Sequence, residues 1–149
     1  MSEKNNGDNY EVRKTEEEWR QALSPDAFRV LRKHGTEPAF RNEYNEHDEE
    51  GVYYCAGCGN PIFPSETKYH SGSGWPSFYA PVDEEKVGKK TDYKILMPRT
   101  EVHCSRCGGH LGHVFKDGPQ PTGLRYCINS AALKFRKGDG DSDEPSPTS

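Results

Sequence analysis

The residues of this chain that could do chemistry include five cysteines, four of which form two Cys-x-x-Cys units. Cys55 pairs with Cys58 and Cys104 with Cys107, and a glycine follows each unit. Two thiolates at this spacing can hold one ion from a tight turn, and two such turns complete a tetrahedron of sulfurs that suits Zn²⁺. Four protein ligands leave no open position, so the spacing predicts one structural zinc ion.

Other interpretations of the four cysteines stay open. They could form two redox-active dithiols or remain unmetallated, and four thiolates can also bind iron. The 45 residues between the two pairs exceed the spacing of a simple zinc ribbon. If zinc is bound, the segment between the pairs is an insert that the metal closes.

Cys127 has no partner at such a spacing and lies in a segment whose residues alternate in character. In a strand the apolar and the polar residues would occupy opposite faces, with Leu124, Tyr126 and Ile128 on one face and Arg125, Cys127 and Asn129 on the other. A neighbouring cation favours thiolate over thiol, so Arg125 would make Cys127 more reactive. The alternative is an inert buried cysteine, the commoner state of a lone cysteine.

Two histidines, His110 and His113, flank Leu111-Gly112 just after the second cysteine pair. They could be a further pair of metal ligands, acid catalysts or structural residues. Because four cysteines already saturate a zinc ion, acid catalysis fits the pair better than metal binding.

The elements that must position these residues begin with two short helices. Thr15 to Glu18 has the pattern of a capping box, with Thr15 at the cap and Glu18 reaching back. Ser24 and Pro25 mark the start of a second helix, which ends near Lys33-His34-Gly35.

From Gly51 onward, short apolar runs alternate with turn residues. This pattern predicts a series of short strands, one of them at Lys94–Met97, whereas the charged segment Asp83–Lys90 is expected to be exposed. The two helices followed by strands predict a mainly β fold.

One folded domain is expected between two polar ends. Residues 1–14 show no apolar periodicity, and residues 138–149 contain only Gly, Asp, Ser, Glu, Pro and Thr, so both segments are predicted to be disordered. The domain would span residues 15–137. No apolar run approaches the ~18 residues of a membrane span, and the N-terminus has no apolar signal core. We therefore expect a cytoplasmic protein.

The charge of the chain disfavours nucleic-acid binding. The net charge is −4, and the last twelve residues hold four acidic side chains and no basic one. The remainder has 20 acidic and 20 basic side chains, with no basic excess to attract nucleic acid or an anionic membrane. A zinc ribbon that binds nucleic acid is therefore disfavoured.

Four motifs in order resemble the B class of methionine sulfoxide reductases, which reduce the R epimer of methionine sulfoxide. They are Ser71–Phe78 (SGSGWPSF), Cys104–Phe115 (CSRCGGHLGHVF), Asp117–Pro119 and Arg125–Ser130 (RYCINS). The similarity runs from about Thr15 to Phe135. It implies a β-tent type of fold with two antiparallel sheets and N-terminal helices, and an enzyme that repairs oxidised proteins.

The resemblance also implies a role for each matching residue. Cys127 would be the nucleophile that becomes a sulfenic acid, and Trp75 the wall that receives the substrate methyl group. His110 and His113 would lie near the sulfoxide oxygen, and one of them would supply a proton. The other matches are Asn129, which would order that network, Asp117 and Arg125, which would shape the site and lower the thiol pKa, and the zinc ligands Cys55, Cys58, Cys104 and Cys107.

Ser73 departs from the family pattern, because many members have a cysteine there that forms a disulfide with the nucleophile. A serine cannot form this bond, so we expect an outside thiol, such as thioredoxin or a glutathione system, to reduce Cys127. The expected substrates are oxidised proteins or peptides and, less well, free methionine sulfoxide, and the expected state is a monomer. The competing hypothesis is a binding module held together by zinc, in which Trp75 lines a ligand pocket and Cys127 is silent.

Overall fold

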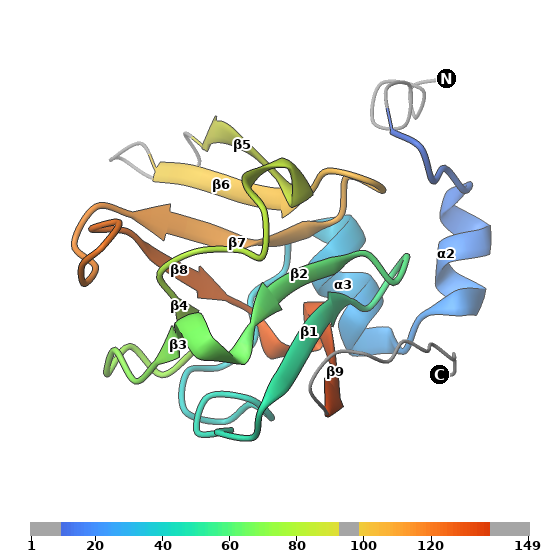
Figure 1. Ribbon diagram of the computed structural model, residues 1–149. Coiled ribbons are helices and arrows are strands. Elements are labelled where there is room, and N and C mark those ends of the chain that lie inside the picture. The colour runs from blue at the N-terminus through green and yellow to red at the C-terminus, as the bar shows by residue number, and fades with distance from the viewer. Residues whose placement is uncertain (1–9, 93–98, 138–149) are drawn as a thin grey trace.

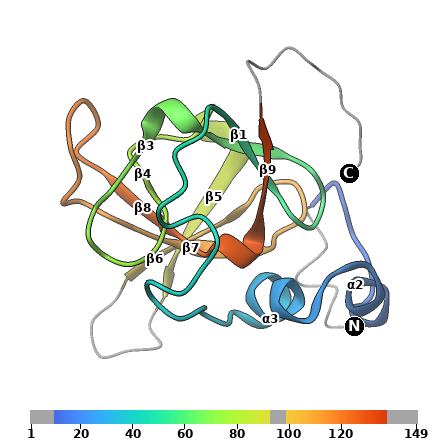
Figure 2. The ribbon, with the colours of Figure 1, turned by 90° about the horizontal axis from the view of Figure 1, so that it is seen from below.

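The computed structural model describes residues 10–92 and 99–137. Its strands form two antiparallel sheets, one with the order β2-β1-β9 and the other with the order β3-β4-β8-β7-β6-β5 (Figure 1). Two helices, α2 (Glu16–Ala22) and α3 (Pro25–Lys33), precede the strands and lie together on one side of them (Figure 2). This confirms the predicted mainly β fold of two antiparallel sheets with two N-terminal helices.

The smaller sheet consists of β1 (Gly51–Cys55), β2 (Pro61–Pro64) and β9 (Leu133–Lys137). The larger sheet consists of β3 (Lys68–Tyr69), β4 (Ser77–Phe78), β5 (Val87–Asp92), β6 (Arg99–Cys104), β7 (His110–Phe115) and β8 (Arg125–Ile128). Single 3₁₀ turns occur at η1 (Ser65–Thr67), η2 (Glu84–Lys86) and η3 (Ser130–Ala132).

The helices begin where their capping residues predict. Thr15 Oγ1 accepts a hydrogen bond from Glu18 N at 3.1 Å, and the Glu18 carboxylate accepts one from Thr15 N at 2.9 Å, which completes the capping box. Ser24 Oγ accepts from Ala27 N at 3.1 Å at the start of α3. At the end of α3, His34 and not the following glycine takes the left-handed conformation, with φ of 58°. This turn leaves the His34 side chain against the larger sheet.

Helix α3 packs on the turns that carry the two cysteine pairs. A Cβ at Gly109 would lie only 2.7 Å from Leu31 Cδ2, and one at Gly57 would lie 3.6 Å from Leu31 Cδ1. Arg32 Nη1 also donates a hydrogen bond to the carbonyl of Cys107 at 3.1 Å. The absence of a side chain at Gly109 therefore lets one leucine of the helix approach both cysteine turns.

Aromatic side chains fill the space between the two sheets. Tyr53 and Phe63 come from the smaller sheet, Phe78 and Tyr126 from the larger one, and all four are fully buried. The rings of Phe63 and Phe78 stack at 4.4 Å between centroids, and Tyr53 meets Phe78 edge to face at 5.2 Å. These contacts place the strand β8, which carries Cys127, with its apolar face in the core.

Strand β5 was not expected, since the charged segment predicted to be exposed, Asp83–Lys90, contains its first four residues. Its Lys89 and Lys90 side chains are indeed exposed, but the backbone pairs with β6 along its whole length. A strand at the edge of a sheet tolerates lysines on its solvent side. The strand expected at Lys94–Met97 lies outside the described residues.

Described residues before Thr15 also contact the rest of the chain. Val12 N donates a hydrogen bond to the carbonyl of Arg106 at 2.9 Å, and the ring of Tyr10 meets that of His103 at 5.9 Å. These contacts dock residues before Thr15 on the second cysteine turn. Among the described residues, each helix is too short or too polar to span a membrane.

Candidate active site and metal centre

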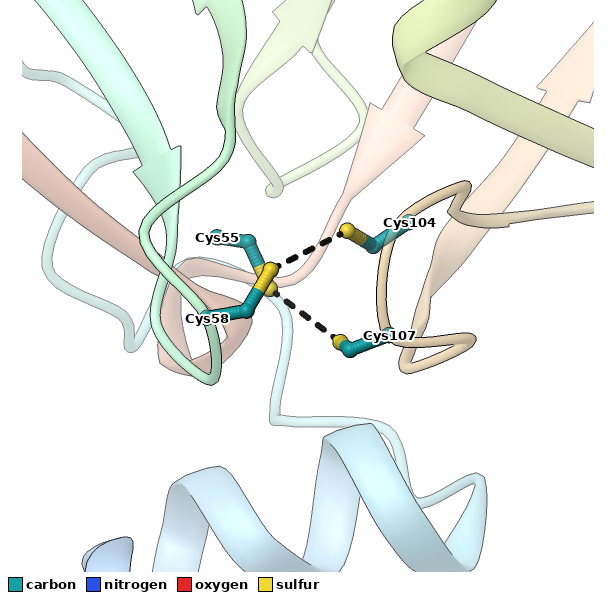
Figure 3. Close-up of side chains that lie close together, drawn as sticks. All are labelled: Cys55, Cys58, Cys104 and Cys107. Carbon is teal, nitrogen blue, oxygen red and sulfur yellow. Dashed lines mark hydrogen bonds between the residues drawn. The ribbon is translucent and has the colours of Figure 1, made fainter. Parts of the chain in front are cut away.

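The four paired cysteines converge on one point between the sheets. Cys55 ends β1 and Cys104 ends β6, and Cys58 and Cys107 lie in the turns that follow (Figure 3). The Sγ atoms of Cys55 and Cys107 are 3.8 Å apart, those of Cys58 and Cys104 are 3.6 Å apart, and all four lie within 4.8 Å of one another. Four sulfurs at ~2.3 Å from a tetrahedral zinc ion would be about 3.8 Å apart. The sulfurs therefore fit a tetrahedral metal ion.

Hydrogen-bond donors around these sulfurs suit thiolates. The backbone N–H of Gly57 donates to Cys55 Sγ at 3.3 Å, and that of Arg106 donates to Cys104 Sγ at 3.4 Å. The Asn60 amide lies 3.5 Å from Cys104 Sγ. Hydrogen bonding to the Cys104 sulfur raises the pKa of the Cys55 thiol well above its usual range, and burial raises it further. Four thiolates at such short distances would require a cation.

Cys127 lies in a different setting, at the wall of a small cavity of about 140 Å³. Strands β7 and β8 and the loop before β4 supply most of the wall. The cavity is lined by Thr36, Trp75, Arg99, Gly112, His113, Phe115, Arg125, Cys127 and Asn129. A larger surface hollow of about 720 Å³ beside α3 contains none of the predicted site residues. The structure thus brings five of the seven predicted catalytic and substrate-binding residues to the smaller cavity.

The neighbours of Cys127 follow from the strand register. Cys127 on β8 pairs with His113 on β7 and with Ser77 on β4. Its Sγ lies 3.6 Å from Ser73 Oγ, which belongs to the loop before β4. Burial raises the pKa of the Cys127 thiol above its usual value, although the hydrogen bond from Ser73 and the charge of Arg125 both lower it. Arg125 thus lowers the pKa of this thiol as expected, but burial raises it by more.

Arg125 interacts with both Cys127 and Asp117. Its Nε and Nη2 atoms donate to the two carboxylate oxygens of Asp117 at 2.9 and 3.2 Å, and its guanidinium lies 4.4 Å from the centroid of the Phe115 ring. The hydrogen bond from Arg125 lowers the pKa of Asp117. Asp117 is mostly exposed and is not part of the cavity wall. It contacts the cavity wall through Arg125.

Trp75 and Asn129 both form hydrogen bonds with the backbone of Glu37, which precedes the strands. The indole Nε1 of Trp75 donates to the carbonyl of Glu37 at 2.9 Å, and Asn129 Oδ1 accepts from Glu37 N at 3.1 Å. Asn129 Nδ2 donates to the carbonyl of Leu111 at 3.0 Å. The two ends of the Asn129 amide are thus bound to the backbone, and Asn129 joins residue 37 to β7.

The two predicted histidines occupy different places. His113 lines the cavity, whereas His110 is buried and is not part of the cavity wall. The ring centroids of the two histidines are 5.5 Å apart. His110 Nδ1 lies 2.8 Å from a carboxylate oxygen of Glu101, which is also buried. His110 is therefore a neighbour of His113 and does not itself face the cavity.

Several residues of the site were not predicted from the sequence. Thr36 and Arg99 line the cavity, and Glu101 holds His110. The carboxylate of Glu37 accepts hydrogen bonds from the backbone N–H groups of Ser130 and Ala131, the second at 2.9 Å. Glu37 lies more than 90 positions before these partners, so no local spacing connects them. No motif in the sequence marks Glu37, which lies in a polar and irregular segment.

Comparisons with known proteins agree on one family. Residues 23–137 match the family model described as the SelR domain. The chain is 58% identical over 129 residues to the peptide methionine sulfoxide reductase MsrB of Leptospira interrogans, with 87% of this chain and 98% of the relative covered. It is 55% identical to the MsrB of Hahella chejuensis, covering 89% and 96%, and 54% identical to that of Methanosarcina barkeri, covering 84% and 88%.

Proposed function

The chain belongs to the SelR-domain family of methionine sulfoxide reductases, and we propose that it reduces the R epimer of methionine sulfoxide in oxidised proteins and peptides through Cys127. The observation that carries the role of Cys127 is the separation of the five thiols. Four sulfurs converge on one point, whereas Cys127 is half-buried at a cavity that also holds His113 and Trp75. A cavity of about 140 Å³ suits a single side chain such as methionine sulfoxide.

The reaction needs a nucleophile at sulfur and an acid at oxygen. A sulfoxide sulfur becomes electrophilic once its oxygen is protonated, so the cavity must supply a proton before or during attack. Cys127 gives two electrons to the sulfur, and the oxygen moves to Cys127 as a sulfenic acid. The products are methionine and Cys127 sulfenic acid. The acid that protonates the oxygen recovers its proton from the Cys127 thiol.

His113 is our candidate for the proton transfer. It lines the cavity and pairs with Cys127 across two neighbouring strands, whereas His110 is hydrogen-bonded to Glu101 outside the cavity wall. Because burial raises the pKa of the Cys127 thiol, removal of its proton benefits from a base nearby. A histidine beside it can accept the thiol proton and pass it to the sulfoxide oxygen. His110 would support His113 from behind.

Trp75 would receive the methyl group of the substrate. Its indole N–H is bound to the carbonyl of Glu37, so the ring is held in place before the substrate arrives. Apolar contact on the methyl side and an acid on the oxygen side would distinguish the two epimers at sulfur. Phe115, which also lines the cavity, would add to the apolar side.

We further propose that an external thiol reductant, such as thioredoxin, regenerates Cys127. The side chain next to its sulfur is the hydroxyl of Ser73, and the four other cysteines form a separate cluster. Zn²⁺ bound to that cluster would tie the turns after β1 and β6 together and take no part in the reaction. The proposed state is a monomer in a reducing cytoplasm, where Cys127 and its reductant stay reduced.

The test is reduction of a methionine sulfoxide peptide, resolved by epimer, with dithiothreitol as reductant. Wild type should consume only the R epimer, and Cys127→Ser should consume neither, with a loss of at least about 10⁴-fold. The metal content and circular dichroism of Cys127→Ser should match wild type, because Cys127 is not part of the four-cysteine cluster. Turnover by folded Cys127→Ser would refute the assignment of the nucleophile.

The route of regeneration has its own test. Wild type is allowed one turnover without a reductant and is then treated with a reagent that labels sulfenic acids. We expect a label on Cys127 and no disulfide between Cys127 and any other cysteine, as read by mass spectrometry. A disulfide to one of the four clustered cysteines would contradict direct reduction by an external thiol.

A further inference from the structure

Three side chains that the reaction scheme does not bring together converge at the end of α3. His34 Nε2 lies 3.1 Å and His110 Nδ1 lies 2.8 Å from the same carboxylate oxygen of Glu101. The three ligand atoms lie within 4.8 Å of one another. Because a carboxylate only accepts hydrogen bonds, each imidazole donates a ring N–H to this one oxygen.

The cluster is held by three different elements. Glu101 lies on β6 and His110 on the neighbouring strand β7, and their side chains are only 5% and 3% exposed. His34 caps α3 from the other side, and its side chain is 44% exposed. The cluster is therefore buried on its inner side and open to solvent at His34.

The charge of the cluster suits a cation. Although burial raises it, the hydrogen bonds from His110 and His34 lower the pKa of Glu101 below its usual range, so the carboxylate is ionised. Among the described residues, the nearest lysine is Lys90, whose Nζ is 4.0 Å from the other carboxylate oxygen. The oxygen that the two histidines share is therefore available to a metal ion.

The donor atoms also have the right kind and spacing. Two imidazole nitrogens and one carboxylate oxygen form a common ligand set for Zn²⁺ with an open fourth position. Ligand atoms ~2.0–2.1 Å from a tetrahedral ion are about 3.3 Å apart, a few tenths of an ångström more than the observed nitrogen–oxygen distances. To hold the ion, His34 would move outward by about 0.2 Å and the His110–Glu101 contact would lengthen by about 0.5 Å.

We propose that His34, Glu101 and His110 form a second site for a divalent transition metal such as Zn²⁺ or Co²⁺, separate from the four-cysteine centre. The ion would replace the N–H protons that the two imidazoles now share with Glu101. Solvent would complete the coordination on the exposed side.

Occupation of this site would inhibit the enzyme, a consequence that rests on the proposed function. The ring of His110 is in contact with that of His113, at 5.5 Å between centroids, and His113 pairs with Cys127. A metal on His110 would place a positive charge behind His113. The charge would disfavour protonation of His113 and slow transfer of a proton to the sulfoxide.

The test compares zinc-loaded wild type with His34→Asn and His70→Asn. Asn tolerates the left-handed conformation that His34 adopts, so the first variant should remove the imidazole and keep the end of the helix. His70 is a comparable exposed histidine, 2.8 Å from Asp48, and serves as the matched control. Co²⁺ is titrated by equilibrium dialysis and by absorption, because ligation by nitrogen and oxygen lacks the intense thiolate-to-cobalt bands that binding to cysteine would produce.

Wild type and His70→Asn should bind one extra Co²⁺ per chain without thiolate bands, and His34→Asn should bind it at least about tenfold more weakly. An unchanged affinity in His34→Asn, or no extra ion in wild type, would overturn the site. A single turnover without added thiol then measures inhibition. Equal turnover of wild type with and without the extra ion would overturn the inhibitory role alone, and the binding result does not depend on whether the chain is a reductase.

Discussion

The same side chain, cysteine, occupies two contrasting regions of this molecule. In the four-cysteine centre, sulfurs from two turns lie 3.6 and 3.8 Å apart and are surrounded by backbone N–H donors. In the cavity, one sulfur lies on a regular strand beside a hydroxyl, a histidine and an arginine. The first environment suits a metal ion and the second suits a small substrate.

The difference shows that neighbouring sulfurs dominate the proton affinity of the clustered thiols, whereas burial dominates that of Cys127. Cys104 and Cys107 are almost fully buried, and Cys127 is half-buried. In the centre, other sulfurs dominate the proton affinities of the thiols, and a bound cation would keep all four ionised. At Cys127, burial sets the direction, while Ser73 and Arg125 moderate it.

Breaking the metal centre should have the largest effect. A structural zinc ion contributes roughly 10–16 kcal/mol to folding, as much as the whole stability of a typical domain, roughly 5–15 kcal/mol. Complete removal of the metal by a strong chelator, or the substitution Cys104→Ser, should therefore unfold the strands. The measurement is circular dichroism with a parallel assay of released zinc. An unchanged spectrum after full release would show that the centre is not structural.

Substitution of His113, the proposed proton donor beside Cys127, should have the next largest effect. It should lower kcat and leave the melting temperature unchanged. His113→Gln should lower kcat by about 10²–10⁴-fold, the usual contribution of a positioned proton donor. His110→Gln should lower it less, because His110 does not line the cavity. Both are measured with the R epimer of a methionine sulfoxide peptide, and the melting temperature is followed as a control. A larger loss in His110→Gln than in His113→Gln would reverse the assignment.

The charge of Arg125 should lower the pKa of the Cys127 thiol. Since a nearby cation favours the thiolate, Arg125→Gln should raise the pKa of Cys127 further and move its alkylation profile to higher pH. A shift of about one pKa unit would slow alkylation at neutral pH about tenfold. Asp117→Asn should shift the profile the other way, because the acid now neutralises part of this charge. The rate of reaction with iodoacetamide against pH, with the other cysteines protected by zinc, measures both variants.

Substitutions of Ser73 should have the smallest effect on the reaction rate of Cys127. One of them should also change how Cys127 is regenerated. Ser73→Ala removes one hydrogen bond, worth ~1 kcal/mol, and should slow the reaction of Cys127 a few-fold. Ser73→Cys should instead place a second thiol against Cys127 and form a disulfide after one turnover, detectable by mass spectrometry. Absence of this disulfide would mean that the two side chains do not meet as the 3.6 Å contact indicates.

Features that depend on neighbouring residues were predicted well. The two helix caps, the alternation along β8 and the turns at the two cysteine pairs all follow from local backbone geometry. The convergence of the four sulfurs also follows, because one tetrahedral ion can explain two Cys-x-x-Cys units. Strand β5 was not predicted because it lies at a sheet edge, and its charged sequence lacks the alternation of apolar and polar residues that marks a half-buried strand.

Features that depend on distant contacts were not predictable. Glu37 holds both the Trp75 indole and the Asn129 amide, and it is 92 residues from Asn129. The pairing of His34 and His110 through Glu101 likewise joins the end of a helix to two strands. Such contacts exist only after the helices have packed on the sheet.

The sequence by itself determined which residues could carry chemistry, because thiol spacing, histidines and an alternating strand are local properties of the chain. The tertiary structure decided how those residues are used. It placed His113 at the cavity and His110 behind it, and it set the direction of the Cys127 pKa. The physical reason is that burial and electrostatic interactions depend on the distances between side chains, and only packing sets those distances.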